Sequence, residues 1–209
     1  MRNIDTIVVH CTATPEGRDV SATEIDSWHK KRGWRGIGYH AVVRLNGETE
    51  NGRDFDNDGD VEEHVGAHTR GHNARSLAVV YAGGLDSNRK PKDTRTPAQK
   101  EALFRKVEDW LEEFNLSPSN VKGHYEFANK ACPCFDMDEF RSELKRRIKA
   151  HDQIVKPVNP RPVEVERVDI RPQRRTGQIV GEKEPKPQNG FGLFITNIFR
   201  SVIRALNSA

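Results

Sequence analysis

Short β-branched runs alternate with capped helical segments along the first 150 residues, and this alternation constrains the fold more than any other feature. Residues 6–10 form a buried strand pattern that ends in a histidine, and residues 77–81 form another, closed by two glycines. Residues 39–45 and 48–51 read as two strands joined by the turn Asn46-Gly47. Because strands and helices are interleaved and one hairpin is antiparallel, we predict an α/β fold: a single domain with a central mixed β-sheet flanked by helices.

Three helices carry recognisable start signals. Residues 21–24, Ser-Ala-Thr-Glu, form a capping box, and we expect the helix behind it to end at Gly33. Residues 96–99, Thr-Pro-Ala-Gln, combine an N-cap, a first-turn proline and a capping-box glutamine. A last helix begins near Asp136. The latter two helices present apolar faces made of Leu103, Val107, Trp110, Leu111 and Phe114, and of Phe140, Leu144 and Ile148.

The composition of the chain changes near residue 150. Ten of the 34 Lys and Arg residues, but only six of the 31 Asp and Glu residues, lie after this point, together with six of the 11 prolines. The net charge of +3 therefore belongs to the tail, and nothing in the overall charge indicates nucleic-acid binding. We divide the chain into a domain at 1–150, a Pro- and charge-rich linker at 151–189 and an amphipathic helix at 190–209.

The predicted C-terminal helix has two arginines and no acidic residue. Its apolar run is too short and interrupted to span a bilayer, so the pattern is that of an interfacial helix that binds anionic membrane lipid. The alternative is that it docks on its own domain or on a second copy of the chain. The apolar face contains Ile195, Ile198, Phe199, Val202, Ile203 and Leu206, and the polar face contains Thr196, Asn197, Arg200, Arg204 and Asn207.

The three cysteines are too few for a disulfide scaffold. Cys132 and Cys134 are too close together to bridge each other or to share one metal ion. Cys11 follows His10 on a strand and therefore points to the opposite side, where we expect a small buried apolar residue. Reduced thiols, or one thiolate on a metal ion, fit this pattern best.

Two histidines and one cysteine form a candidate metal site. His10 stands at a strand end, where a sheet presents side chains to a cleft, and His124 and Cys132 share the segment 123–133. Two imidazoles and one thiolate are enough for a catalytic zinc ion with an open fourth position. A lone histidine is more often a structural residue than a metal ligand, and we expect His29 and His151 to lie at the protein surface.

Four motifs follow one another along the chain. They are Val-Val-His-Cys-Thr-Ala-Thr at 8–14, Gly-Tyr-His at 38–40, Gly-Ala-His and Gly-His-Asn within 66–73, and Gly-His-Tyr-Glu-Phe-Ala-Asn-Lys-Ala-Cys-Pro at 123–133. In this order they resemble the zinc-dependent N-acetylmuramoyl-L-alanine amidases (type 2), most closely the small bacteriophage endolysins. The resemblance covers roughly residues 4–148 and also includes Trp-His-Lys at 28–30 and the helix start at 96–99, whereas the tail lies outside it.

The resemblance implies the fold of amidases and peptidoglycan-recognition proteins, with Zn²⁺ bound by His10, His124 and Cys132. It places Tyr39 and Lys130 at catalytic positions. Zinc would activate water and polarise the scissile carbonyl, and Lys130 would stabilise the developing oxyanion. Tyr39 would orient the water or pass a proton to the leaving amine. Without the resemblance, Tyr39 would be a core aromatic and Lys130 a solvated charge.

The implied reaction is hydrolysis of the amide that joins N-acetylmuramic acid to L-alanine, by a phage or prophage endolysin acting in host lysis. His68 and Asn73 resemble cleft-wall positions that touch the muropeptide, and we expect Glu126 to support its loop rather than to act as a base. The N-terminus has no apolar signal core. We therefore expect synthesis in the host cytoplasm and action on the cell wall after the membrane is permeabilised.

Two other functions fit the same resemblance. Relatives of this fold include non-catalytic peptidoglycan-binding modules, which usually lose the cysteine ligand, whereas Cys132 is present here. Some phage amidases also bind and inhibit the phage RNA polymerase. The few residues before the first strand leave only a short arm for such a contact.

An acidic segment, Asp-Phe-Asp-Asn-Asp-Gly-Asp-Val-Glu at 54–62, departs from the compact family pattern. Its alternating acids and the glycine at the sixth position resemble the start of a calcium loop. The twelfth position, which should be glutamate, is Val65. We interpret the segment as an acidic turn, with a weak calcium site as the alternative.

Overall fold

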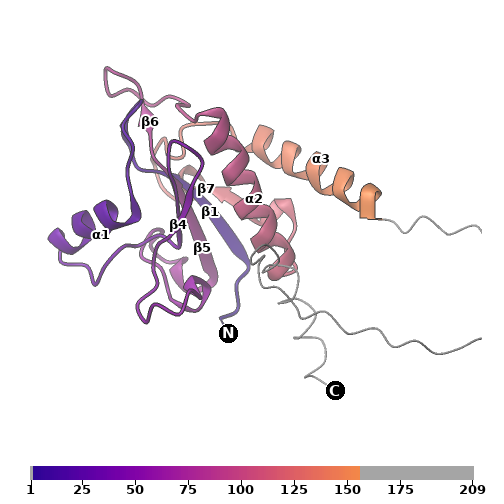
Figure 1. Ribbon diagram of the computed structural model, residues 1–209, viewed down its shortest axis with the longest axis horizontal. Coiled ribbons are helices and arrows are strands. Elements are labelled where there is room, and N and C mark those ends of the chain that lie inside the picture. Colours follow the sequence, from indigo (N-terminus) through magenta and orange to yellow (C-terminus); the bar gives the residue numbers. More distant parts are fainter. Residues whose placement is uncertain (1, 156–209) are drawn as a thin grey trace, which may run out of the picture. The chain divides into compact units, whose positions relative to one another are not determined.

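A mixed five-stranded sheet forms the centre of the protein, whose computed structural model describes residues 2–155. The strand order is β4-β3-β5-β1-β7, and only β4 is antiparallel to its neighbour (Figure 1). The predicted α/β fold with a mixed sheet is confirmed. The strands are β1 (Thr6–Cys11), β3 (Ala41–Val43), β4 (Thr49–Asn51), β5 (Ser76–Tyr81) and β7 (Val121–Gly123).

Helices cover both faces of this sheet. The helix α1 (Ala22–Lys31) lies on one face, and α2 (Pro97–Glu113) and α3 (Met137–Val155) lie on the other (Figure 1). Alternate residues of each strand supply the two cores: Val79 packs with α2 and α3, and Val80 packs with α1. Each face of the sheet is therefore dry, as parallel strands require.

The smaller elements complete residues 2–155. The strands β2 (Thr14–Pro15) and β6 (Gly84–Leu85) form a separate parallel pair. None of the helices in this part of the chain combines the length and the apolar composition that a membrane span needs. The 3₁₀ helices are η1 (Val61–Glu63), η2 (Asn73–Arg75), η3 (Pro118–Asn120) and η4 (His124–Glu126).

The last helix, α3, includes the first five residues that the sequence assigns to the linker, since it continues to Val155. The rest of the predicted linker and the whole predicted helix at 190–209 lie outside the described residues.

The helix starts follow the capping signals of the sequence. At α2, the Thr96 hydroxyl accepts the Gln99 amide and the Gln99 side chain accepts the Thr96 amide, each at 3.0 Å, which completes the capping box. At α1, Ser21 accepts the Glu24 amide at 3.2 Å, but the Glu24 carboxylate pairs with Arg18 at 2.6 Å. The predicted box at α1 is therefore only half formed.

The β3–β4 hairpin differs from the prediction. The strands are shorter than residues 39–45 and 48–51, and the Arg44 amide donates to the Glu48 carbonyl at 2.8 Å. Three residues, Leu45, Asn46 and Gly47, therefore form the loop instead of two. Gly47 has a φ of +85°, which is the left-handed position that such three-residue loops place on glycine.

The sheet register places the first parts of the site. Val9 of β1 pairs with Gly123 of β7, so His10 and His124 follow directly from paired positions in two parallel neighbours. Because parallel strands end at the same edge of a sheet, these two imidazoles meet at the carboxyl edge.

Candidate active site

The three predicted metal ligands converge at this edge. His10 comes from the end of β1, His124 from the start of η4, and Cys132 from the loop that leads to α3. One ligand atom from each lies within 4.8 Å of the others, and His10 Nδ1 is 3.8 Å from Cys132 Sγ. The ring centroids of His10 and His124 are 4.5 Å apart. Residues far apart in the sequence thus present two nitrogens and one sulfur to a common point.

The surroundings favour the metal-binding protonation state of each group. Complete burial lowers the pKa of His10 well below its usual value, and neighbouring positive groups add to this effect. Burial, followed by the charge of Lys130, lowers the pKa of His124. Hydrogen bonding from Cys11 lowers the pKa of Cys132, whose sulfur accepts the Cys11 backbone N–H at 3.2 Å. Neutral imidazoles and a thiolate are the forms that bind metal ions.

This donor set fits zinc. Zinc–nitrogen bonds of about 2.0–2.1 Å and a zinc–sulfur bond of about 2.3 Å at a tetrahedral angle place the two donor atoms ~3.6 Å apart. The observed separation between His10 Nδ1 and Cys132 Sγ is 3.8 Å. Three protein ligands leave one position open, as catalytic zinc sites do.

The two predicted catalytic residues adjoin the ligands. Tyr39 lies just before β3 rather than within a strand, and its ring centroid is 5.0 Å from that of His10. Burial raises the pKa of Tyr39, and a negative charge on Cys132 raises it further, so the hydroxyl stays protonated. Lys130 is exposed and, within residues 2–155, its ammonium has no ion-pair partner.

A cavity of about 390 Å³ opens beside the ligands. Four predicted site residues line it: His68, Asn73, His124 and Lys130. Its charged lining residues, Arg70 and Lys130, are both basic. The remaining wall residues were not predicted from the sequence, although a tryptophan directly after the end of the predicted helix at Gly33 was an available signal. The wall residues that were missed are Trp34, Ala67, Thr69, Arg70, Gly71, Phe127 and Ala128.

His68 and Asn73 lie on the loop that leads into β5. The Asn73 side-chain oxygen accepts the backbone amides of His68 at 2.9 Å and Thr69 at 2.8 Å, which holds the loop closed. No residue between 2 and 155 is hydrogen-bonded to Asn73 Nδ2, the other half of the amide. His68 Nδ1 lies 3.2 Å from His10 Nε2, so His68 contacts a candidate ligand directly.

His29 differs from its prediction as a surface residue. It is only 5% exposed, its Nδ1 accepts the Gly38 amide at 3.0 Å, and its ring lies against Trp34. The helical pattern placed it on α1, but the loop after α1 folds back over the ring. His151 is exposed, as predicted.

The remaining polar residues near the site behave largely as expected. Cys11 is buried and its sulfur lies 3.6 Å from that of Cys134, and both are free thiols. Glu126 accepts the Gly123 amide at 2.8 Å and pairs with Arg141 at 2.9 Å, so it supports the loop that carries His124.

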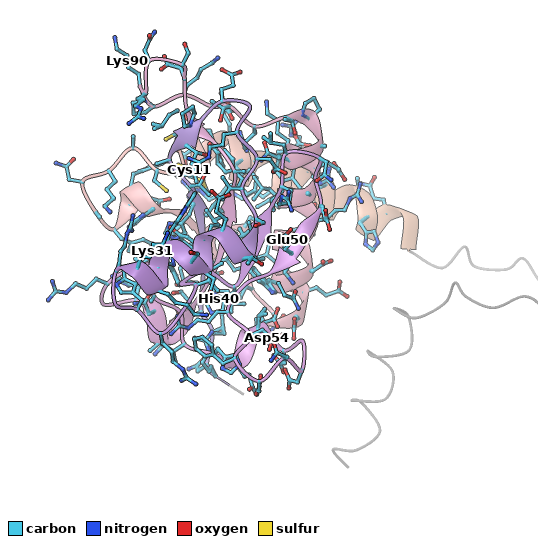
Figure 2. The ribbon with its side chains drawn as sticks, turned by 60° about the vertical axis from the view of Figure 1, so that its left-hand side comes forward. Cys11, Lys31, His40, Glu50, Asp54 and Lys90 are labelled. Carbon is cyan, nitrogen blue, oxygen red and sulfur yellow. The ribbon has the colours of Figure 1, made fainter. Side chains whose placement is uncertain are left out.

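Asp54, the first residue of the acidic segment at 54–62, lies apart from Cys11, the neighbour of the candidate ligand His10 (Figure 2). Asp54 accepts the Gly59 amide at 3.1 Å, and Asp58 accepts the Asp60 amide at 2.8 Å. His64 contacts Asp56 at 3.1 Å. Asp54 and Asp58 thus stabilise the turn itself. The groups Asp54, Asp56 and His64, and Asp56, Asp58 and Glu63, also have ligand atoms within 4.8 Å of one another, so a weak calcium site stays the alternative.

Comparison with known proteins adds a family to this geometry. The profile described as "N-acetylmuramoyl-L-alanine amidase" matches residues 1–135. The endolysin of Escherichia phage T7 is 38% identical over 133 residues, which cover 64% of this chain and 82% of that protein.

Solved structures agree at the level of the fold. The N-acetylmuramoyl-L-alanine amidase LysC from Clostridium intestinale superposes with a TM-score of 0.57 at 29% identity, covering 69% of this chain and 87% of that one. Drosophila PGRP-LB reaches a TM-score of 0.50 at 19% identity over 64% of this chain and 76% of its own. The second similarity is one of fold alone, and it agrees with the predicted likeness to peptidoglycan-recognition proteins.

Proposed function

The chain belongs to the N-acetylmuramoyl-L-alanine amidase family, and from this premise we propose that it works as a zinc enzyme. It is a peptidoglycan hydrolase related to phage endolysins, and its reaction is cleavage of the amide between N-acetylmuramic acid and L-alanine. One observation supports the zinc proposal above all others: His10, His124 and Cys132 bring their ligand atoms within 4.8 Å of one another beside a cavity.

His10, His124 and Cys132 would hold the ion. When bound, zinc supplies a Lewis acid that polarises the scissile carbonyl and lowers the pKa of water. The protein prepares the ligands for this role, because burial keeps the imidazoles neutral and the Cys11 amide stabilises a thiolate at Cys132. Zinc prefers this mixed nitrogen and sulfur donor set over the oxygen sets typical of calcium or magnesium.

Lys130 and Tyr39 would act on the reacting amide. The Lys130 ammonium on the cavity wall, which has no ion-pair partner among residues 2–155, would stabilise the negative charge that develops on the carbonyl oxygen. Tyr39 is held protonated by burial, so it donates a hydrogen bond that orients the attacking water or delivers a proton to the leaving amine. In the same transition state, Lys130 would therefore act on the carbonyl oxygen and Tyr39 on the water or the leaving amine.

The residues that line the cavity favour an anionic peptide as the part of the substrate that binds there. Its charged residues, Arg70 and Lys130, are cationic and suit the carboxylates of a stem peptide. Asn73 Nδ2 is available to donate to the muropeptide. Both ring nitrogens of His68 already have protein partners, so His68 offers the substrate only its ring carbons.

For residues beyond 155, the proposal rests on the sequence alone. We assign residues 156–189 as a linker and residues 190–209 as a helix that binds anionic membrane lipid, because the pattern at 190–209 combines an apolar stripe with two arginines. Synthesis in the host cytoplasm, followed by action on the wall, agrees with relatives that are phage endolysins.

A non-catalytic peptidoglycan-binding module is the second candidate. It would share the cavity but would not need a metal ion or Lys130. Retention of all three ligand residues with their ligand atoms in reach favours the enzyme.

The test compares Cys132→Ser with Cys134→Ser, since both replace a half-buried thiol of the same loop. Zinc content and the clearing of purified peptidoglycan suspensions are measured for each. We expect Cys132→Ser to lose zinc and activity together and Cys134→Ser to keep both. Equal activity in wild type and Cys132→Ser would overturn the proposed mechanism.

A further inference from the structure

The side of His10 that faces away from the proposed metal has one polar partner. His10 Nδ1 faces Cys132, whereas Nε2 lies 3.2 Å from His68 Nδ1 and, within residues 2–155, has no other hydrogen-bond partner. The His10 side chain is completely buried, so water does not substitute for this contact. The ring nitrogen of His68 that carries the proton therefore determines which ring nitrogen of His10 carries one.

The proton on His68 is fixed from its other nitrogen. Ser76 is fully buried, and its hydroxyl donates its single proton to the His72 carbonyl at 2.8 Å. Ser76 Oγ also lies 3.3 Å from His68 Nε2. Because its only proton is already committed, Ser76 Oγ must accept at this contact, so His68 carries its proton on Nε2.

The tautomer of His68 determines the tautomer of the candidate ligand His10. With its proton on Nε2, the neutral ring of His68 has an unprotonated Nδ1, whose single lone pair is shared by the Thr69 hydroxyl at 3.0 Å and His10 Nε2 at 3.2 Å and can only accept from either. His10 must therefore carry its proton on Nε2, which leaves the lone pair of Nδ1 free and directed to the side of Cys132. This is the tautomer that a metal ion at the ligand cluster requires.

Packing holds the His68 ring at this position. A Cβ atom placed on Gly66 would lie 2.5 Å from Cδ2 of His68 and 2.8 Å from Cε1 of His40. The absence of a side chain at Gly66 thus makes room for both rings. His40 itself is fixed, because its Nδ1 accepts the Ala78 amide at 2.9 Å and its Nε2 contacts the His64 carbonyl at 2.9 Å.

We propose that His68 is a positioning residue that, with Ser76 behind it, sets the tautomer and ring orientation of His10 for zinc binding. The pair takes the place that a carboxylate or a backbone carbonyl usually has behind a metal-binding histidine. The inference rests on the proposed zinc site for its consequence, but the tautomers themselves exist without the metal.

The test uses the matched substitutions His68→Asn and His68→Leu, which have nearly the same shape. Asparagine places an acceptor oxygen where His68 has Nδ1, and leucine places none. Zinc affinity is measured by competition with a chromogenic chelator on metal-free full-length protein. We expect His68→Leu to bind zinc about 10–100-fold more weakly and His68→Asn to stay within about threefold of wild type. Equal affinity of the two variants, whether weakened or unchanged, would overturn the proposal.

A second measurement needs neither the variants nor the metal. Two-bond nitrogen–proton correlation spectra of metal-free wild type, labelled with ¹⁵N-histidine, report which ring nitrogen is protonated. We expect the proton on Nε2 in both His10 and His68, and a proton on Nδ1 of His10 would overturn the proposal. Failure of wild type to bind zinc would count against the proposed function alone, since the spectra still decide the tautomers.

Discussion

Lys130 and Tyr39 lie beside the same ligand cluster, yet the protein treats them in opposite ways. Lys130 is exposed on the cavity wall, whereas Tyr39 is packed against His10 and its pKa is raised by burial. An exposed ammonium is free to follow the substrate oxygen as charge develops, while a buried phenol acts from a fixed position. Their separate roles in the reaction follow from this difference in environment.

Replacement of Lys130 by methionine tests its role at the level of one residue. Loss of one group that stabilises an oxyanion typically lowers kcat by about 10²–10³-fold, and we expect this loss with little change in zinc content. Steady-state hydrolysis of peptidoglycan and metal analysis provide the measurement. The control is Lys90→Met, which changes an exposed lysine on the loop between β6 and α2, a residue that does not line the cavity (Figure 2). An unchanged kcat in Lys130→Met would remove it from the mechanism.

His40 predicts how stability depends on pH. Burial, with repulsion from Arg2 and Arg53, lowers the pKa of His40 to about 3. The unfolded chain takes up this proton near pH 6.5, whereas the folded protein resists it until about pH 3. His40 therefore leaves stability unchanged above about pH 6.5 and reduces it as the pH falls from there towards 3, by up to about 1.4 kcal/mol per pH unit.

The measurement is the free energy of unfolding by urea at several pH values for wild type and His40→Asn, which keeps an acceptor for the Ala78 amide. We expect a shallower slope between pH 6.5 and 3 in the variant. His151→Asn changes an exposed histidine and should keep the wild-type slope. Parallel slopes for wild type and His40→Asn would contradict the pKa shift.

Sequence patterns located the candidate ligands but not the contact behind them. His10, His124 and Cys132 stand in recognisable local motifs, so the zinc hypothesis needed no three-dimensional information. The contact between His68 and His10 depends on the parallel pairing of β1 with β5, which no local pattern encodes. The burial of His29 was missed for the same reason, since the covering loop folds back from outside the helix.

At the scale of elements, Gln99 joins the start of α2 to the sheet. Its side chain is fully buried and donates to the Ala82 carbonyl at 2.9 Å and, more weakly, to the Val43 carbonyl at 3.4 Å. Its oxygen meanwhile accepts the Thr96 amide. One residue therefore caps the helix and bonds to backbone groups after β5 and in β3.

We expect Gln99→Leu to destabilise the protein by about 1–3 kcal/mol, because it leaves the Ala82 carbonyl buried without a donor. Thermal and urea unfolding would measure this loss. Lys100→Leu, at the next and exposed position of α2, serves as the control and should lie within about 0.5 kcal/mol of wild type. A Gln99→Leu variant as stable as wild type would show that these hydrogen bonds contribute nothing net.

Elements were predicted well where local signals and tertiary packing agree. The capping box of α2 formed as expected because the other partners of Thr96 and Gln99, the Leu45 and Ala82 carbonyls, accept hydrogen bonds and leave the two capping oxygens free to accept the backbone amides. The box at α1 is incomplete because Arg18 attracts the Glu24 carboxylate, and the β3–β4 loop gains a residue because Arg44 pairs with Glu48. Both differences come from partners that the local pattern does not specify.

At the scale of the whole molecule, the site exists only in the assembled sheet. Its ligands come from β1, from η4 after β7, and from the loop before α3, so the unfolded chain has no preformed site. Zinc binding should therefore stabilise the folded state. Predictions for the tail beyond residue 155 rest on its sequence alone.

Deletion of residues 190–209 tests the proposed membrane contact. We expect co-sedimentation with vesicles that contain anionic lipid to fall strongly, since both the apolar stripe and the two arginines are removed. Hydrolysis of purified peptidoglycan, which involves no membrane, should persist. A full-length variant with Arg200→Gln and Arg204→Gln separates the charge contribution from the apolar one. Unchanged vesicle binding after the deletion would defeat the membrane proposal.

The most direct measurement of the central claim is the chemistry of the product formed by metal-free protein before and after zinc is returned. Purified peptidoglycan is digested, and new amino groups on L-alanine and new reducing sugar ends are counted. We predict that zinc restores the release of L-alanine amino groups and produces no reducing ends. Release of reducing ends, or full amidase activity without zinc, would contradict the assignment of His10, His124 and Cys132 as the zinc centre of an amidase.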